Sequence, residues 1–179
     1  MIVELVVGVA GSGKTTYCNS KDAHRIFHDA WVTEQYQDEE VECDMRNIFY
    51  PHLNFARVNK KSIGALISTN LEYNTLLRNY FKIKFVFYIL DAAILATGLE
   101  KNLFVIECPF LDENIEALKK LYPDKLVVTQ VTASEETIKD RLIARGWSDE
   151  RIAMSHEYQL AELSRFKYLV DNVVSTENN

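Results

Sequence analysis

Residues 8–15 read GVAGSGKT and match the pattern G-x-x-x-x-G-K-[ST] at every fixed position. Glycines in this pattern let backbone N–H groups converge on phosphate oxygens, and the helix that follows adds positive potential. Lys14 would reach the β- and γ-phosphates of a nucleotide, and the Thr15 hydroxyl would bind Mg²⁺. The spacing therefore predicts a site for a nucleoside triphosphate and its magnesium ion.

A second apolar run ends in a carboxylate that suits the same nucleotide and magnesium site. Residues 103–107 read LFVIE, four apolar residues followed by Glu107. On its own this pattern is weak, because any buried strand can end in glutamate. Beside the phosphate-binding loop, a carboxylate at the end of the neighbouring strand would hold the water shell of Mg²⁺. We therefore expect Glu107 to be the second magnesium residue.

Three further residues have types that suit phosphoryl transfer. Arg141 and Arg145 are four residues apart and so share one helix face, where cations can stabilise a migrating phosphoryl group. Asp29 follows a short strand pattern at residues 23–28, so its carboxylate is expected at the sheet edge where ligands bind. There it can orient an acceptor hydroxyl and take its proton. Surface ion pairs for the arginines and helix capping by Asp29 are the alternatives.

The elements that must position these residues alternate between strands and helices. Apolar runs predict strands at residues 2–7, 23–28, 103–106, 126–131 and 168–170. Caps and helical spacing predict helices at residues 15–21, 113–121, 134–146 and from 148 or 149 to 165, a mostly helical stretch at 60–99, and a polar tail at 172–179. The alternation indicates an α/β fold with a five-stranded parallel sheet and helices on both faces.

The chain is expected to form one domain with two specialised parts. The core takes residues 1–34 and 100–172, a helical acceptor-binding insertion lies at about 35–99, and an arginine-bearing lid lies at about 138–158. The long stretch between the second and third strands is where a substrate-binding insertion would sit.

Composition limits the partners and the compartment. The 179 residues carry a net charge of −6, without the cation excess of a non-specific nucleic-acid binder, so small molecules are the expected partners. The most apolar stretch, residues 85–97, is too short for a membrane span and contains Asp91. Three scattered cysteines and the absence of a signal pattern favour reduced thiols in the cytoplasm. The oligomeric state is not indicated.

Several segments, in chain order, resemble the dephospho-CoA kinase family within the P-loop nucleotide kinases. Residues 59–64 (NKKSIG) resemble its D-R-x-x-L-G segment, and residues 108–113 (CPFLDE) resemble its P-L-L-F-E segment. Residues 131–145 are similar to its V-x-x-S-x-E-x-Q…R…R lid helix. Gln159 and residues 168–172 (YLVDN) are similar to its Q…A-D-Y-V-I-D-N ending.

The resemblance implies the three-layer P-loop kinase fold and transfer of the ATP γ-phosphoryl to the ribose 3′-hydroxyl of dephospho-CoA. It implies that Asp29 is the base and that Arg141, with Lys14, stabilises the transferring group. The residues that it assigns to binding ATP are Gly11, Ser12, Gly13, Lys14, Thr15, Thr16, Arg145 and Asn172.

The departures from the family lie on the acceptor side, so other functions stay open. The family's D-A-D is here residues 28–31 (HDAW), and its His-Pro falls at Lys82-Ile83. A guanylate-kinase-like nucleoside monophosphate kinase is the first alternative, since residues 141–146 (RLIARG) match that lid. Against it, the insertion has only three arginines to bind an acceptor phosphate. A non-catalytic ATP-binding module is the second alternative, and the acidic charge disfavours a polynucleotide 5′-kinase.

Overall fold

The computed structural model describes residues 2–28, 31, 79, 82–89, 91, 103–108 and 111–177. Chain contacts divide the protein into one unit of Met1–His28 with Tyr88–Asn179 and a second unit of Asp29–Phe87. In the second unit the Trp31 and Phe85 rings are both buried and lie 5.0 Å apart. Most of the predicted insertion at about 35–99 lies outside the described residues.

The first unit is built on a five-stranded sheet in the order β2-β3-β1-β4-β5, in which every neighbouring pair is parallel. This confirms the predicted sheet. The central strand β1 is its most buried part, because Leu5, Val6 and Val7 have no exposed surface. The strands are β1 (Ile2–Val7), β2 (His24–Phe27), β3 (Leu103–Glu107), β4 (Leu126–Thr132) and β5 (Asn172–Ser175).

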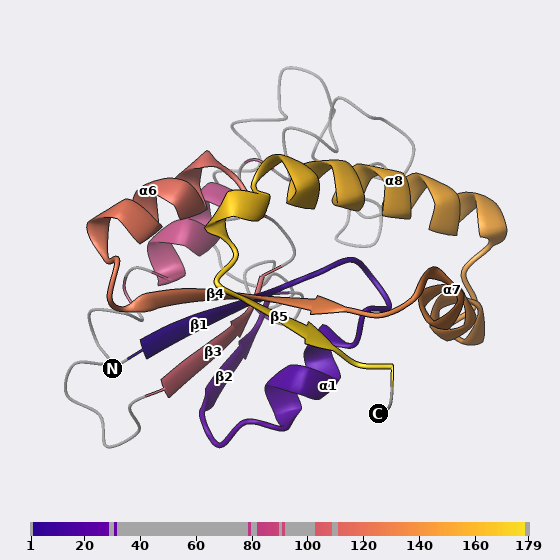
Figure 1. Ribbon diagram of the computed structural model, residues 1–179, viewed down its shortest axis with the longest axis horizontal. Helices are drawn as coiled ribbons and strands as arrows, with labels where there is room; N and C mark the ends of the chain where they lie inside the picture. The colour runs from indigo at the N-terminus through magenta and orange to yellow at the C-terminus, as the bar shows by residue number, and fades with distance from the viewer. Residues whose placement is uncertain are drawn as a thin grey trace, which may run out of the picture. The chain divides into compact units, whose positions relative to one another are not determined.

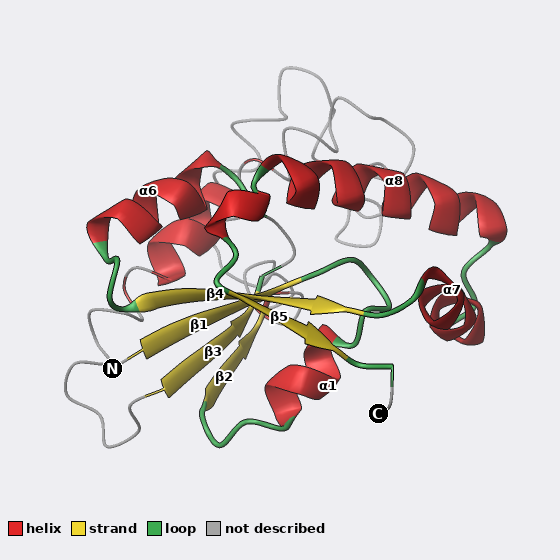
Figure 2. Ribbon diagram, viewed as in Figure 1, coloured by secondary structure: helices red, strands yellow, loops and turns green. Residues whose placement is uncertain are grey.

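Helices cover both faces of the sheet, as predicted. The crossover from β1 to β2 runs one way across the sheet, whereas those from β3 to β4 and from β4 to β5 run the other way. Right-handed connections therefore place α1 on one face and the later helices on the other, and Figures 1 and 2 show α6 and α8 opposite α1. The helices are α1 (Lys14–Asn19), α6 (Glu113–Leu121), α7 (Glu135–Ala144) and α8 (Asp149–Arg165).

Side-chain caps fix where the three longer helices begin. Asp112 accepts hydrogen bonds from the backbone N–H groups of Asn114 and Ile115 at the start of α6. Ser134 and Ser148 each accept one from the residue three positions later, at the starts of α7 and α8. These are the positions that the capping rules predict, so the helix starts follow from local sequence.

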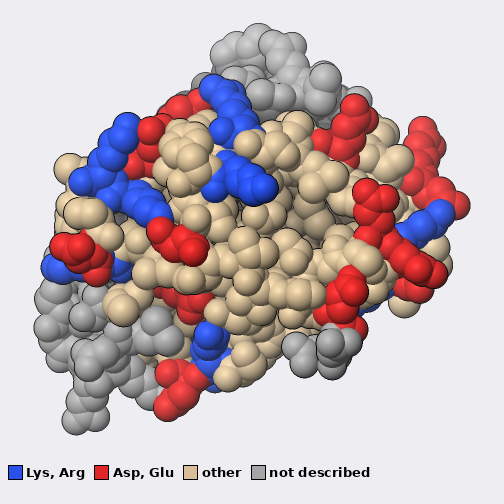
Figure 3. All heavy atoms as spheres, viewed as in Figure 1, with Lys and Arg blue, Asp and Glu red and all other residues tan. Residues whose placement is uncertain are grey.

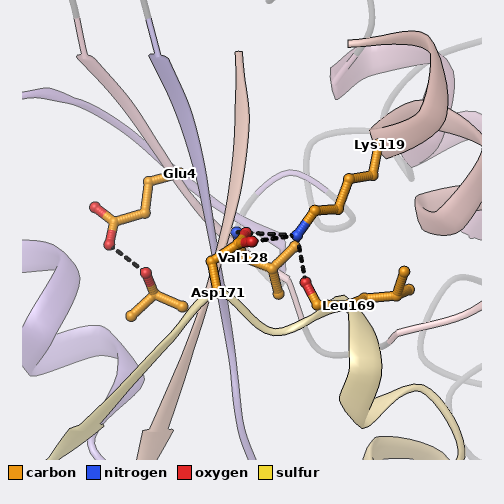
Figure 4. Close-up of polar contacts among 6 residues, drawn as sticks. Glu4, Lys119, Val128, Leu169 and Asp171 are labelled. Carbon is orange, nitrogen blue, oxygen red and sulfur yellow. Dashed lines mark hydrogen bonds and ion pairs between the residues drawn. The ribbon is translucent and has the colours of Figure 1, made fainter. Parts of the chain in front are cut away.

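The predicted last strand at residues 168–170 is wrong, and so is the predicted polar tail from residue 172. Lys167–Leu169 form a 3₁₀ helix that buries Leu169, and the strand is β5, which pairs with β4. The physical reason is Asp171. Its backbone N–H donates to the Val128 carbonyl oxygen at 2.8 Å, and its carboxylate accepts hydrogen bonds from the Val128 N–H at 2.8 Å and from Lys119 Nζ at 2.6 Å (Figure 4). These contacts hold Asp171 against β4, and the paired residues of β5 follow it.

Charge on the visible surface is mixed. Figure 3 shows basic side chains gathered mainly toward α6 and the end of α8, and acidic ones mainly toward α7 and the start of α8. On this face the described residues form no continuous basic surface. Among the described residues, none of the helices has both the length and the apolar character needed to cross a bilayer.

Candidate functional site

The loop between β1 and α1 has a shape that only glycine permits at two positions. Gly11 and Gly13 have φ angles of +81° and +93°, in the left-handed region. A Cβ on Gly13 would lie 2.8 Å from Thr176 Oγ1, and one on Gly11 would lie 3.1 Å from the Ile138 carbonyl oxygen. The loop therefore packs closely against its neighbours, with glycine at each close approach.

Lys14 begins α1 and folds back over the loop. Its side chain is buried, and Nζ donates hydrogen bonds to the carbonyl oxygens of Gly8 at 2.9 Å and Val9 at 3.0 Å. The ammonium group thus lies on the loop itself, where the sequence pattern requires a cation for a bound phosphate.

Thr15 and Glu107 are brought together by strand pairing. Glu107 ends β3, which lies directly beside β1 with Val6 paired to Glu107. Thr15 Oγ1 donates a hydrogen bond of 2.9 Å to Glu107 Oε2. A hydroxyl and a carboxylate suit Mg²⁺, which binds through one or two protein oxygens together with substrate phosphates and water. Among the described residues, no three His, Cys, Asp or Glu side chains form a cluster able to hold a metal, and the pair of Thr15 and Glu107 stays the predicted metal site.

The other residues predicted to bind the nucleotide differ in how far they are buried. Ser12 is fully buried, and its Oγ has no hydrogen-bond partner within the part of the chain that the structure describes. Thr16 is exposed on α1, and Arg145 is exposed at the C-cap of α7. Asn172 is exposed at the first position of β5. The roles of these residues stay predictions.

Arg141 lies against the loop. Its guanidinium donates from NH1 to the Gly11 carbonyl oxygen at 3.2 Å, and from NH2 to the Thr176 carbonyl oxygen at 2.8 Å. The predicted catalytic cation is therefore in contact with the phosphate-binding loop, although Asp29, the predicted base, falls outside the described residues.

Two residues at the loop were not singled out from the sequence as its partners. The Gln159 side-chain oxygen accepts a hydrogen bond from the Ala10 N–H at 2.6 Å, and Thr176 Oγ1 donates to the Ser12 carbonyl oxygen at 2.6 Å. Both contacts span more than one hundred residues of chain. The family resemblance includes Gln159, so the sequence could have pointed to it. Thr176 lies in the predicted polar tail, where no sequence pattern marks it.

In the predicted lid, the Arg151 guanidinium lies 3.9 Å from the centre of the Trp147 ring. This cation–π contact places a positive charge over one face of the indole ring.

Hydrogen bonds to the buried Glu4 carboxylate join β1 to α1 and β4. Glu4 on β1 accepts hydrogen bonds from Tyr17 at 2.8 Å and from Thr129 at 2.7 Å. Burial raises the pKa of the Tyr17 hydroxyl, and Glu4 raises it further. Burial also raises the pKa of the Cys18 thiol to about 12, with smaller contributions from the carboxylates of Glu107 and Glu4. Cys18 is therefore a neutral core thiol.

The strand order and the position of the loop after β1 define the P-loop kinase fold. No protein-family model matches the chain, and no curated protein matches it. Similar solved structures include TT1252 from Thermus thermophilus, with 21% sequence identity and a TM-score of 0.66 over 99% of this chain and 88% of that one. They also include dephospho-CoA kinase from Campylobacter jejuni, with 19% identity and a TM-score of 0.59 over 99% and 89% of the two chains.

A more distant similarity has the same architecture. Shikimate kinase from Bacteroides thetaiotaomicron is 14% identical, with a TM-score of 0.52 over 97% of this chain and 86% of that one. The similarities confirm the predicted fold class, including its likeness to dephospho-CoA kinase.

Proposed function

We propose that the protein is an ATP-dependent kinase that phosphorylates a small molecule, with the 3′-hydroxyl of dephospho-CoA as the acceptor. The observation that carries the proposal is the meeting of Lys14, Thr15 and Glu107 at the carboxyl ends of β1 and β3. The likeness of the fold to a dephospho-CoA kinase and to a shikimate kinase supports transfer to a hydroxyl group.

The residues present fit the substrate and its metal ion. Backbone N–H groups of Gly11, Ser12 and Gly13 and the ammonium group of Lys14 would bind the phosphates of ATP. The oxygens of Thr15 and Glu107 would hold Mg²⁺, which supplies positive charge to the β- and γ-phosphates when bound.

Each protein group has a distinct part in the transfer. Lys14 would exchange its carbonyl contacts on the loop for phosphate oxygens as ATP enters. Arg141, which contacts the Gly11 carbonyl oxygen of the loop, would add charge stabilisation. Asp29 would orient the acceptor hydroxyl and accept its proton, a role that rests on the resemblance to the family. The helices α7 and α8 would exclude water from the site.

The acceptor is tested by measuring ADP release from Mg·ATP with dephospho-CoA and with a panel of nucleoside and deoxynucleoside monophosphates. We expect turnover with dephospho-CoA and its loss in Asp29→Asn. Turnover with a monophosphate alone would replace the proposed acceptor and favour the guanylate-kinase-like alternative. If the protein binds ATP but releases no ADP with any acceptor, the result would favour the non-catalytic ATP-binding module.

A further inference from the structure

We propose that Thr176, the residue that follows β5, is a positioning residue that sets the conformation of the phosphate-binding loop and joins it to helix α7. The inference rests on the proposed function, because it assigns Thr176 to the binding of the nucleotide phosphates.

Thr176 is held in place independently of the loop. Only 2% of its surface is exposed, and its backbone N–H donates a hydrogen bond of 2.9 Å to the Thr132 carbonyl oxygen at the end of β4. Because β4 and β5 are paired up to Thr132 and Ser175, the sheet fixes the position of the next residue. Thr176 is thus a rigid support at the carboxyl edge of the sheet.

The Thr176 side chain holds the loop from this support. Its Oγ1 donates to the Ser12 carbonyl oxygen at 2.6 Å, and the same hydroxyl oxygen lies 2.8 Å from where a Cβ on Gly13 would stand. In a trans peptide the C=O and the following N–H point in opposite directions. Fixing the Ser12 carbonyl toward Thr176 therefore points the Gly13 N–H away from it, so this donor has a set direction before any phosphate binds.

Thr176 also connects the loop to α7. Arg141 NH1 donates to Thr176 Oγ1 at 3.0 Å, NH2 donates to its carbonyl oxygen at 2.8 Å, and NH1 reaches the Gly11 carbonyl oxygen at 3.2 Å. The threonine hydroxyl is both the donor to the loop and an acceptor from the arginine. Removing that one hydroxyl therefore breaks a contact on each side, while the backbone contact to Arg141 remains.

The test compares Thr176→Val, which keeps the shape and loses the hydroxyl, with Thr176→Ser, which keeps the hydroxyl. Thr132→Val is the matched control, because it removes a hydroxyl that bonds Val174 at 3.4 Å on the same strand pair. We expect the dissociation constant of Mg·ADP to rise about tenfold in Thr176→Val. It should rise less than about threefold in Thr176→Ser and Thr132→Val, within the usual spread of such effects.

A second readout needs no nucleotide. Amide hydrogen exchange in the ligand-free protein should be faster at residues 11–14 in Thr176→Val and unchanged there in Thr132→Val. If Thr176→Val does not fold, Thr176→Ala removes the hydroxyl without a second methyl group. Equal Mg·ADP affinity in wild type and Thr176→Val, or equal exchange at the loop, would overturn the inference. Failure of the wild type to bind Mg·ADP would overturn the proposed function instead, and the exchange experiment would still decide on Thr176.

Discussion

The pairing of Thr15 with Glu107 gives the clearest residue-level prediction. Replacing Glu107 by glutamine keeps an acceptor for the Thr15 hydroxyl but removes the negative charge that would attract Mg²⁺. We expect the Mg²⁺ concentration for half-maximal turnover to rise about 10- to 100-fold. Titration of Mg²⁺ at saturating ATP measures this concentration.

The matched control is Glu113→Gln, which removes a carboxylate whose ion pair with Arg165 at 3.0 Å is largely exposed on the surface. It should leave the Mg²⁺ dependence unchanged. A Glu107→Gln enzyme with a wild-type Mg²⁺ requirement would show that the carboxylate does not serve the metal.

Cys18 gives a prediction about stability at alkaline pH. Its thiol has a pKa of about 12 in the folded protein against a reference of 9.0, so the native state keeps a proton that the unfolded state releases. The stability linked to this thiol is therefore complete below pH 9 and is lost as the pH rises toward 12. For one proton the loss is at most about 1.4 kcal/mol per pH unit.

Urea unfolding between pH 8 and 11 measures this effect by comparing wild type with Cys18→Ala. The variant should be less stable at pH 8 because it leaves a small cavity in the core. Its free energy of unfolding should fall less steeply above pH 9. Parallel curves for the two proteins would contradict the assigned cause.

Among the elements, those with strong local signals were predictable from the sequence. The apolar run of β1, the cap at Ser134 and the cap at Ser148 each determine a boundary through adjacent residues. The strand β5 has no such run: it reads NVVS, and Val173 is 64% exposed at the edge of the sheet. Its position depends on Asp171 and its partners on α6 and β4, contacts that lie more than forty residues away in the chain.

Asp171 should therefore stabilise the junction of α6, β4 and β5. Asp171→Ala leaves the Val128 N–H without its side-chain acceptor and Lys119 without its ion pair at 2.6 Å. Because the aspartate side chain is 40% exposed, the expected loss of unfolding free energy is modest, about 1–2 kcal/mol. Chemical denaturation measures this loss.

The control for this junction is Lys139→Met, which removes a surface ion pair with Asp149 whose two side chains are 55% and 78% exposed. Its denaturation midpoint should stay at the wild-type value. An Asp171→Ala protein as stable as Lys139→Met would mean that β4 pairing alone places β5.

For the molecule as a whole, the parallel sheet explains how distant segments form one site. The carboxyl ends of β1, β3, β4 and β5 lead to Gly8, Cys108, Ala133 and Thr176, so all these chain segments reach the same edge. The motif after β1 predicted Lys14 and Thr15, and the apolar run of β3 predicted Glu107 at its end. Thr176 could not be predicted, since its contacts depend on the complete sheet rather than on neighbouring residues.

The most direct test of phosphoryl transfer at this loop is ADP formation from Mg·ATP in the presence of dephospho-CoA, comparing wild type with Lys14→Ala. The wild type should form ADP and CoA in equal amounts. Lys14→Ala should keep the far-UV circular dichroism spectrum of the wild type and lose at least about 100-fold in rate, because it lacks the cation for the transferring phosphoryl group. Equal rates in the two proteins, or no ADP from the wild type with dephospho-CoA or any monophosphate, would contradict the proposal.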